Sequence, residues 1–269
     1  MSREETRFLL SDDVREFLAQ RRAVTHVRFL LPFLHTGMDV LDAGCGPGSI
    51  TVDLAEHVAP GQVIGVDIEE YHVEMATDLA AKRDVTNAHF EIGDVSALEF
   101  PDATFDAVLL HGVVEYLPNP VQIYREALRV LKPGGVLGTR HGDWGGFLLA
   151  PHDDMIQHFL DLFVKLMEYG GGDAHCGRHQ LSYLRQAGFE HIAVSASYDC
   201  WTPRPAITAQ TAQFLAGYCE SAEFRLAIEH AGLDVAESLP KYARAIRDWG
   251  RHPDAFAAEA WGEAVAWKP

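Results

Sequence analysis

The hydrophobic positions of this chain follow two different periods that alternate along its length. Short apolar runs end at glycine or at a polar residue, and they predict buried strands. Between them, apolar residues recur at helical spacing and predict helices. We expect strands over residues 38–43, 62–66, 88–92, 105–110, 136–140, 191–198 and 260–268. We expect helices over residues 48–57, 69–83, 118–131, 154–169, 178–187, 206–231 and 234–250.

Two regions stand outside this alternation. Residues 12–35 have apolar positions at helical spacing, among them Val27 and Leu31, and predict two helical segments before the first strand. Residues 141–151 are rich in glycine and tryptophan and predict a loop.

A strand followed by a helix at this rhythm predicts right-handed βαβ units and a parallel sheet with helices on both faces. The expected fold class is therefore α/β, with a doubly wound and mostly parallel sheet of seven strands. Helices would precede the sheet, and a helical insertion would come before the last strand. Because such a sheet binds ligands outside the carboxyl ends of its strands, we expect functional residues directly after each strand.

The first predicted strand runs into a glycine-rich turn, residues 44–48 (GCGPG), which is preceded by Asp42. Glycines let the backbone turn tightly and let a ligand lie against bare main chain. A dinucleotide loop, G-x-G-x-x-G, would require glycine at the position of Ser49. The turn therefore favours a ligand without a pyrophosphate, and a glycine-rich turn that binds nothing is the alternative.

A second carboxylate, Asp67, ends the second predicted strand. A carboxylate at this place can accept hydrogen bonds from both hydroxyls of a ribose. The competing interpretation is that Asp67 caps the helix that follows.

Four segments occur in order along the first half of the chain: VLDAGCGPGSIT, VIGVDI, GDVSALEFPDATFDAVLLHGVVEYLPNP and LRVLKPGG. With them the chain resembles the class I S-adenosylmethionine-dependent methyltransferases. Within that class it is similar to the methyltransferase type 11 enzymes of ubiquinone and menaquinone biosynthesis. The likeness covers residues 22–140 in detail. It implies a Rossmann-like fold, S-adenosyl-L-methionine as the cofactor and S-adenosyl-L-homocysteine as the product.

We expect four parts in such a protein. Residues 1–36 would form an N-terminal helical segment on the substrate side, and residues 37–200 the cofactor-binding Rossmann-like core. Residues 201–258 would form a helical cap, and residues 259–269 the final strand of the core sheet.

The resemblance assigns cofactor contacts to the turns after the first four strands. The glycine turn would line the amino-acid part and the sulfonium, and Asp42 would hold the ammonium group. Asp67 would bind the ribose and Asp94 the adenine amino group. The cofactor residues implied in this way are Asp42, Gly44, Cys45, Gly46, Gly48, Asp67, Ile68, Gly93, Asp94, Val95 and His111.

Methyl transfer from a sulfonium is an in-line displacement, for which positioning can supply about 7–11 kcal/mol of the barrier. An oxygen or carbon nucleophile can also need a general base. His111 follows the fourth strand and His141 the fifth, and both are candidate bases because imidazole titrates near neutral pH. The alternatives are that His111 is a pocket contact, that His141 is a loop residue, and that the enzyme acts by proximity alone.

Aromatic residues in the variable parts of the chain are candidates for the acceptor pocket. They are Phe29, Trp144, Phe147, Tyr198 and Trp201. Ordinary core packing is the alternative for each of them. As a group they predict a lid that shields the reaction from water.

The charge and the cysteine content argue against several classes of ligand and partner. The 269 residues include 22 basic and 39 acidic side chains, a net charge of −17, which argues against nucleic-acid binding. The four cysteines are scattered and form no CxxC pair, so we expect neither a disulfide framework nor a bound metal. With no secretory signal and no apolar stretch of about 20 residues, we expect a cytoplasmic protein without integral membrane association. A homo-oligomer is compatible with the sequence.

The expected function is therefore methylation of a small, lipophilic molecule by S-adenosylmethionine, at oxygen or carbon. A quinone, an isoprenoid or another secondary metabolite would fit an apolar pocket. Two alternatives stay open at this point. One is a cyclisation or rearrangement with bound cofactor, with or without methyl transfer. The other is a binding subunit whose catalytic residues have decayed.

Overall fold

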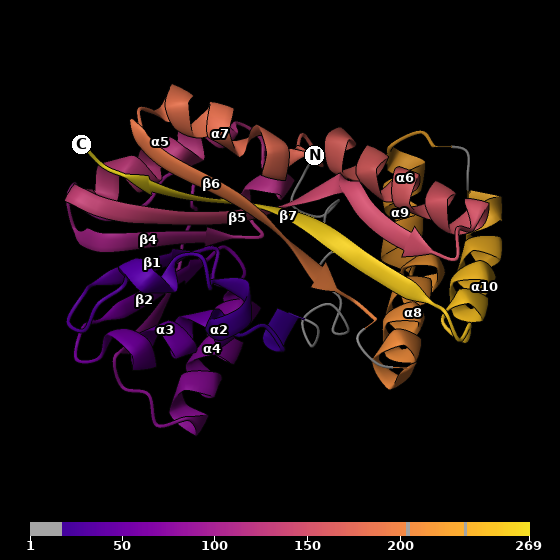
Figure 1. The fold of residues 1–269 in the computed structure, drawn as a ribbon, viewed down its shortest axis with the longest axis horizontal. Coiled ribbons are helices and arrows are strands. Elements are labelled where there is room, and N and C mark those ends of the chain that lie inside the picture. Colours follow the sequence, from indigo (N-terminus) through magenta and orange to yellow (C-terminus); the bar gives the residue numbers. More distant parts are fainter. Residues whose placement is uncertain (1–17, 203–204, 234–235) are drawn as a thin grey trace.

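The computed structural model describes residues 18–202, 205–233 and 236–269, so residues 1–17 of the predicted N-terminal segment lie outside it. The described residues form one sheet of seven strands in the order β3-β2-β1-β4-β5-β7-β6 (Figure 1). The strands are β1 (Val40–Ala43), β2 (Val63–Asp67), β3 (Ala88–Ile92), β4 (Phe105–His111), β5 (Leu131–Ala150), β6 (His191–Cys200) and β7 (Phe256–Trp267). β7 is antiparallel to β5 and β6, and the other neighbours are parallel. The predicted α/β class with a mostly parallel sheet is confirmed.

The helices cover both faces of this sheet, because alternate residues of a strand point to opposite sides. The helices are α2 (Ala23–His26), α3 (Ser49–Val58), α4 (Glu70–Lys82), α5 (Pro120–Val130), α6 (Asp154–Tyr169), α7 (Cys176–Ala187), α8 (Pro205–Glu220), α9 (Ala222–His230) and α10 (Leu239–Trp249). Short 3-10 turns are η2 (Leu31–Phe33), η3 (Val114–Tyr116) and η4 (Ala236–Ser238). On β4, Val108 and Leu110 pack with α5 and α7. Ala107 and Leu109 pack with α2, α3 and α4 on the other face.

The segment from 141 to 151, predicted as a loop, continues as β5 up to Ala150. β7 supplies the partner, and the two strands stay paired as far as Ala150 with Phe256. The register shifts between Asp143 and Leu148, where the glycine-rich stretch bulges out of the ladder. The loop prediction was wrong because glycine and tryptophan there mark a bulge in a strand, and the pairing strand lies more than a hundred residues away in the sequence.

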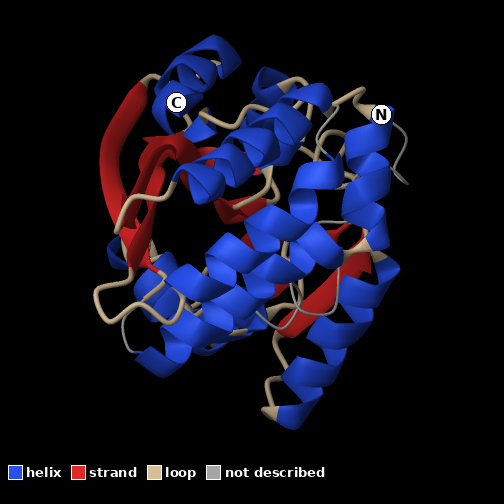
Figure 2. Ribbon diagram, turned by 90° about the vertical axis from the view of Figure 1, so that its right-hand side faces the viewer, coloured by secondary structure: helices blue, strands red, loops and turns tan. Residues whose placement is uncertain are grey.

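The far ends of β5 and β7 carry a group of helices that stands apart from the main sheet (Figure 1). Seen from that side, helices lie in front of the strands (Figure 2). Helices α6, α8, α9 and α10 share a single apolar cluster with Trp201 and Ala257. Since α6 packs in this cluster, we propose a cap that adds α6 to residues 201–258. None of the described helices is both long and apolar enough to cross a membrane.

Between Arg21 and the first strand, the described part of the chain contains less helix than predicted. Only α2, of four residues, and the 3-10 turn η2 form between Arg21 and the first strand. Pro32 lies in the first turn of η2, and proline lacks the N–H that a continuing helix would need. The apolar spacing was nevertheless informative, because Val27, Leu30 and Leu34 are buried against the sheet.

Helix α7 approaches the sheet more closely than ordinary side chains permit. Gly177, in the first turn of α7, lies directly over Gly262 of β7. A methyl group added at Gly262 would overlap the carbonyl oxygen of Gly177, and one added at Gly177 would lie 2.7 Å from the carbonyl oxygen of His141. Because both obstacles are backbone atoms, neither can be relieved by a change of rotamer.

We therefore expect Gly262→Ala to destabilise the protein by about 3 kcal/mol or more, the upper end of overpacking costs. Gly134→Ala is the control, because its added methyl meets nothing within 4 Å although φ is +75°. That change should cost about 1–2 kcal/mol, the usual penalty of a left-handed conformation. Urea unfolding measures both, and equal losses would contradict the close contact between α7 and β7.

Candidate active site

A cavity of about 610 Å³ lies where the carboxyl ends of the parallel strands meet the cap. Its sheet side is formed by residues 44–47, 67–69, 93–96 and 111–113, which follow β1, β2, β3 and β4. Its cap side is formed mainly by aromatic side chains, Trp144, Phe159, Phe163, Trp201, Phe214 and Tyr218. One cavity therefore joins polar turns to an aromatic compartment.

Most of the predicted cofactor residues come together here. The ones that line the cavity are Asp42, Gly44, Cys45, Gly46, Asp67, Ile68, Gly93, Asp94, Val95 and His111. They meet because parallel strands end at one edge of the sheet, which places the turns after them side by side. Gly48 does not line the cavity.

The glycines of the first turn have different structural reasons. Gly44 and Gly48 have φ of +86° and +78°, and a methyl group on either would overlap Val113 or Ala76. Gly46 also has a positive φ, +52°, but an added methyl there meets nothing within 4 Å. Gly46 therefore presents bare backbone to the cavity, whereas the predicted role of Gly48 is corrected: its missing side chain makes room for α4.

Asp67 ties the glycine turn to the end of β2. Its carboxylate accepts hydrogen bonds from the backbone N–H of Gly46 at 2.8 Å and of Glu69 at 3.0 Å. The ring of His72, from α4, contacts the same carboxylate at 3.2 Å. His72 lines the cavity, and its Nε2 has no partner among the described residues. His72 was not predicted from the sequence, because a histidine in the first turn of a helix looks like an ordinary helix residue.

Asp42 is a buried carboxyl at the floor of the turn, with 2% of its surface exposed. Burial raises its pKa to about 7, and the nearby charge of Asp67 acts in the same direction. The hydroxyl of Thr51 donates a hydrogen bond to it at 2.6 Å, which partly offsets the cost of burial. Near neutral pH, Asp42 is therefore poised between its neutral and charged forms.

Asp94 and its neighbours form the third turn. The carboxylate of Asp94 accepts hydrogen bonds from the N–H of Ser96 at 2.8 Å and from its hydroxyl at 2.7 Å, which fixes its orientation. Val95 is buried beside it, and Ile68 keeps 38% of its surface exposed. An exposed isoleucine and a buried valine across one cavity offer two apolar surfaces to a flat ring.

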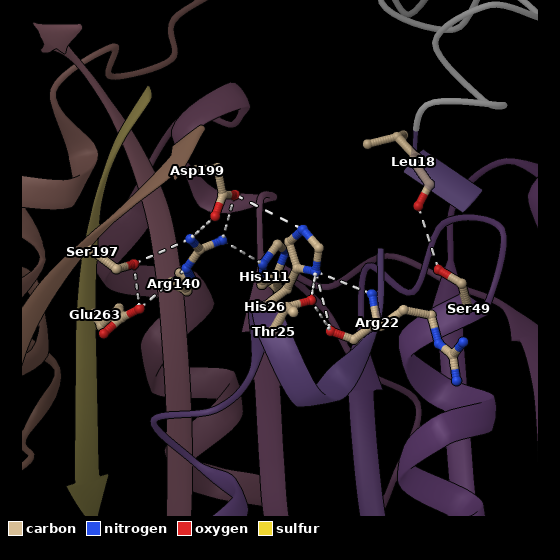
Figure 3. Close-up of polar contacts among 10 residues, drawn as sticks. All are labelled: Leu18, Arg22, Thr25, His26, Ser49, His111, Arg140, Ser197, Asp199 and Glu263. Atoms are coloured by element: carbon tan, nitrogen blue, oxygen red, sulfur yellow. Dashed lines mark hydrogen bonds and ion pairs between the residues drawn. The ribbon is translucent and has the colours of Figure 1, made fainter. Parts of the chain in front are cut away.

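His111 lines the cavity, but its surroundings do not favour a role as a general base. Arg140, which can only donate, places Nη1 3.1 Å from Nε2 of His111, so the ring carries its proton on Nδ1 (Figure 3). Burial lowers the pKa of His111 well below its usual range, and the positive charges of Arg21 and Arg140 add to this. The ring stacks on Trp261 with centroids 5.3 Å apart. The pocket-contact interpretation of His111 fits this geometry, and the prediction of a base does not.

His141 lies outside the cavity and is fully buried. Its Nδ1 is 2.7 Å from a carboxylate oxygen of Glu115, and its Nε2 is 2.7 Å from the hydroxyl of Thr139. Both ring nitrogens are thus occupied. The prediction that His141 takes a proton from the acceptor was wrong, because residue 141 belongs to a strand and points to the opposite side from Arg140.

The predicted acceptor residues divide into two groups. Trp144 and Trp201 line the cavity, and Phe147 lies behind them with its ring 5.2 Å from that of Trp201. Phe29 is instead partly buried against the apolar cluster that includes α2, α3 and α4, and Tyr198 is 52% exposed on β6. Neither of these two lines the cavity, because Phe29 precedes η2 on the far face and Tyr198 points to solvent.

Several residues of the aromatic compartment were not predicted from the sequence. Phe159 and Phe163 of α6 and Tyr218 of α8 carry the same helical spacing as core residues, so pattern alone could not separate them. Glu259 had a signal, because it interrupts the small and aromatic residues of the last strand. Burial raises the pKa of Glu259 to about 8.

The contrast between the glycines predicts different stabilities. Gly46→Ala should cost about 1–2 kcal/mol, because only the left-handed conformation opposes it. Gly48→Ala should cost roughly 1–3 kcal/mol more, because its methyl would also lie 2.5 Å from Cβ of Ala76. Thermal and urea unfolding compare the two variants with the wild type. If both changes cost the same, α4 does not require glycine at 48.

Comparison with known proteins agrees with these features. The family described as "Methyltransferase domain" matches residues 34–188. The probable methyltransferase ltbC of Aspergillus luteorubrus is 30% identical over an alignment of 281 positions that covers 92% of each chain. The 27-O-demethylrifamycin SV methyltransferase of Amycolatopsis mediterranei is 37% identical over 176 residues, 64% of this chain and 61% of its own. The crystal structure of the cyclase SpnF, at 24% identity, aligns with a TM-score of 0.54 over 96% of this chain and 80% of its own, which shows a shared fold.

The strand order, the glycine turn and these matches lead to one conclusion. The chain belongs to the class I S-adenosylmethionine-dependent methyltransferases.

Proposed function

We propose that the protein transfers the methyl group of S-adenosylmethionine to oxygen or carbon of a small, largely apolar molecule. The observation that carries this proposal is the single cavity that joins the glycine turn to the aromatic compartment under the cap. The name of the relative from Amycolatopsis mediterranei, 27-O-demethylrifamycin SV methyltransferase, supports an acceptor of this size class. The net charge of −17 opposes a polyanionic acceptor.

The polar turns have the donors and acceptors that the cofactor requires. Asp42 would pair with the ammonium group, and the bare backbone at Gly46 would lie against the methionine part. Asp67 would accept hydrogen bonds from the ribose hydroxyls, with the unpartnered Nε2 of His72 beside it. Asp94 would face the adenine amino group. The ring itself would lie between Ile68 and Val95, the two apolar residues at that end of the cavity.

The acceptor compartment would work mainly by positioning. The cofactor, when bound, supplies an electrophilic methyl group on a sulfonium. The aromatic walls hold an apolar acceptor in line with that methyl group and exclude water, and orientation of this kind can lower a barrier by about 7–11 kcal/mol. Trp144, Phe163 and Trp201 come from different elements, β5, α6 and the turn after β6, so the cap and the strand arm build this compartment together.

Incubation of the purified protein with methyl-deuterated cofactor and a panel of lipophilic phenols, quinols and isoprenoids tests the proposal. Mass spectrometry should find one labelled methyl group on at least one acceptor. Gly46→Val, which fills the backbone cradle, should abolish transfer and cofactor binding. A product of unchanged mass but altered structure would instead indicate a cyclisation or rearrangement. An absence of cofactor binding in calorimetry would indicate a decayed subunit.

The buried carboxyl of Asp42 predicts a pH-dependent cofactor affinity. Its pKa of about 7 in the free protein is above the ordinary value, and pairing with an ammonium group favours the charged form. Binding should therefore release a proton, and the affinity should fall by up to about tenfold per pH unit below pH 7. Calorimetry from pH 5.5 to 8 in two buffers of different ionisation enthalpy measures both effects.

Two variants serve as controls for this pH dependence. Asp42→Asn should bind the cofactor weakly, with no change of affinity between pH 6 and pH 8. Asp94→Asn, in the third turn, should weaken binding but keep the dependence, because Asp42 is still present. Equal affinities of the wild type at pH 6 and pH 8 would remove Asp42 from the ammonium site.

A further inference from the structure

Two charged side chains of the cavity have no part in the proposed cofactor site. Glu259 comes from β7 and is 6% exposed, and Arg21 comes from the segment before α2. Within the described residues, neither the carboxyl of Glu259 nor the guanidinium of Arg21 has a hydrogen bond or an ion pair. Arg21 is partly buried and Glu259 is buried, and their opposite charges act on each other. A buried carboxyl without a hydrogen-bond partner is costly, which points to a ligand that supplies one.

Both groups belong to the acceptor side. Glu259 is two residues from Trp261 along β7, so the two side chains share one face of the strand. An oxygen of Glu259 lies 3.1 Å from the position where Gly142 would carry a Cβ, and the indole nitrogen of Trp144 lies 3.7 Å from the same point. Glu259 and Trp144 are therefore within about 7 Å of each other.

Arg21 packs against Trp261 and against the turn after β4. Its guanidinium carbon is 5.4 Å from the centre of the Trp261 ring. Its Nη1 lies 3.1 Å from the position of a Cβ on Gly112, the residue directly after β4. Since the turn after β4 borders the cofactor side, Arg21 lies at the junction of the two compartments.

We propose that Glu259 is the general base of the methyl transfer, and that Glu259 and Arg21 together select an acceptor in which an acidic hydroxyl adjoins a carbonyl oxygen, such as an ortho-acyl phenol or an enol. This inference rests on the proposed function and deepens it. The hydroxyl donates to Glu259, and the carbonyl oxygen accepts from Arg21.

The proposed step is balanced. The hydroxyl proton passes to the carboxylate of Glu259 as the oxygen electron pair forms a bond to the methyl carbon. The carbon–sulfur bond breaks and its electron pair stays on sulfur, so the products are a methyl ether and S-adenosylhomocysteine. Glu259 then loses the proton to solvent. Arg21 stabilises the negative charge that develops on the conjugated oxygens.

The electrostatic surroundings suit a base rather than a permanent anion. The pKa of Glu259 is raised to about 8, mainly by burial. Arg21 and Arg140 oppose this rise, and the negative charges of Asp199 on β6 and Glu115 in η3 contribute to it. A carboxylate of this kind accepts a proton more readily than an ordinary glutamate. The same Arg21 disfavours a cationic amine, which separates the proposed acceptors from ammonium compounds.

Binding to the complex with S-adenosylhomocysteine tests the selection of the acceptor. Ortho-hydroxyacetonaphthone is the probe, and acetonaphthone, which lacks the hydroxyl, is its matched control. Calorimetry should show that the wild type binds the hydroxy ketone at least tenfold more tightly. This preference should be lost in Glu259→Gln and in Arg21→Met. The affinity for S-adenosylhomocysteine should stay within about twofold in Glu259→Gln.

Methyl transfer to the same probe tests the base. Glu259→Gln should lower kcat by about 100- to 10,000-fold, the range for general base catalysis. The wild-type kcat should rise with pH up to about 8, because only the ionised carboxyl accepts a proton, and the variant should lose this rise. Glu259→Asp should retain part of the activity and the rise. Glu229→Gln, the same change on the exposed face of α9 outside the cavity, should keep the wild-type profile.

The outcomes separate this inference from the proposed function. Transfer with an unchanged rate and pH profile in Glu259→Gln would overturn the role of Glu259 while the methyltransferase activity stands. Preferred transfer to naphthylamine would overturn the acceptor class. If the hydroxy ketone binds with the expected preference but receives no methyl group, the site for hydroxy ketones is supported and the proposed transfer falls.

Discussion

The antiparallel pairing of β5 with β7 is the interaction on which the rest of the architecture depends. One part of this ladder belongs to the main sheet and the other carries the cap, so two hydrophobic clusters share a pair of strands. Backbone hydrogen bonds tolerate little change in spacing, and the ladder therefore fixes the distance between the polar turns and the aromatic compartment. The cavity is the volume that this distance leaves.

The half of the molecule that surrounds the glycine turn could be predicted from the sequence. Its signals are local, because each short apolar run is followed directly by the turn that it positions. Asp42, Gly46 and Asp67 all lie within three residues of a strand end, and all three line the cavity. The pattern could not show that Gly48 makes room for a helix, because the neighbour that requires it, Ala76, is distant in the sequence.

The aromatic compartment could be predicted only in part, at Trp144 and Trp201, because its parts meet through contacts that are distant along the chain. The extension of β5 depends on a partner strand at the opposite end of the sequence. The role of His141 was predicted wrongly because successive side chains of a strand point to opposite faces. Residue 141 belongs to a strand, so its side chain points away from the side that Arg140 faces. Phe159 and Phe163 have the helical spacing of core residues. Only the tertiary structure shows that their side chains line the cavity.

The bulge between Asp143 and Leu148 is a place where the length of the chain can change without a change in the pairing of β5 with β7. There the four residues from Trp144 to Phe147 are unpaired, and they lie opposite a single residue of β7, Glu259. Pairing resumes at Leu148 with Ala258. Residues could be added to or removed from this excursion without shifting the register on either flank. Changes in the length of this segment alter the size of the acceptor compartment and leave the backbone around the glycine turn unchanged. Substrate preference can therefore change in this fold while cofactor binding is kept.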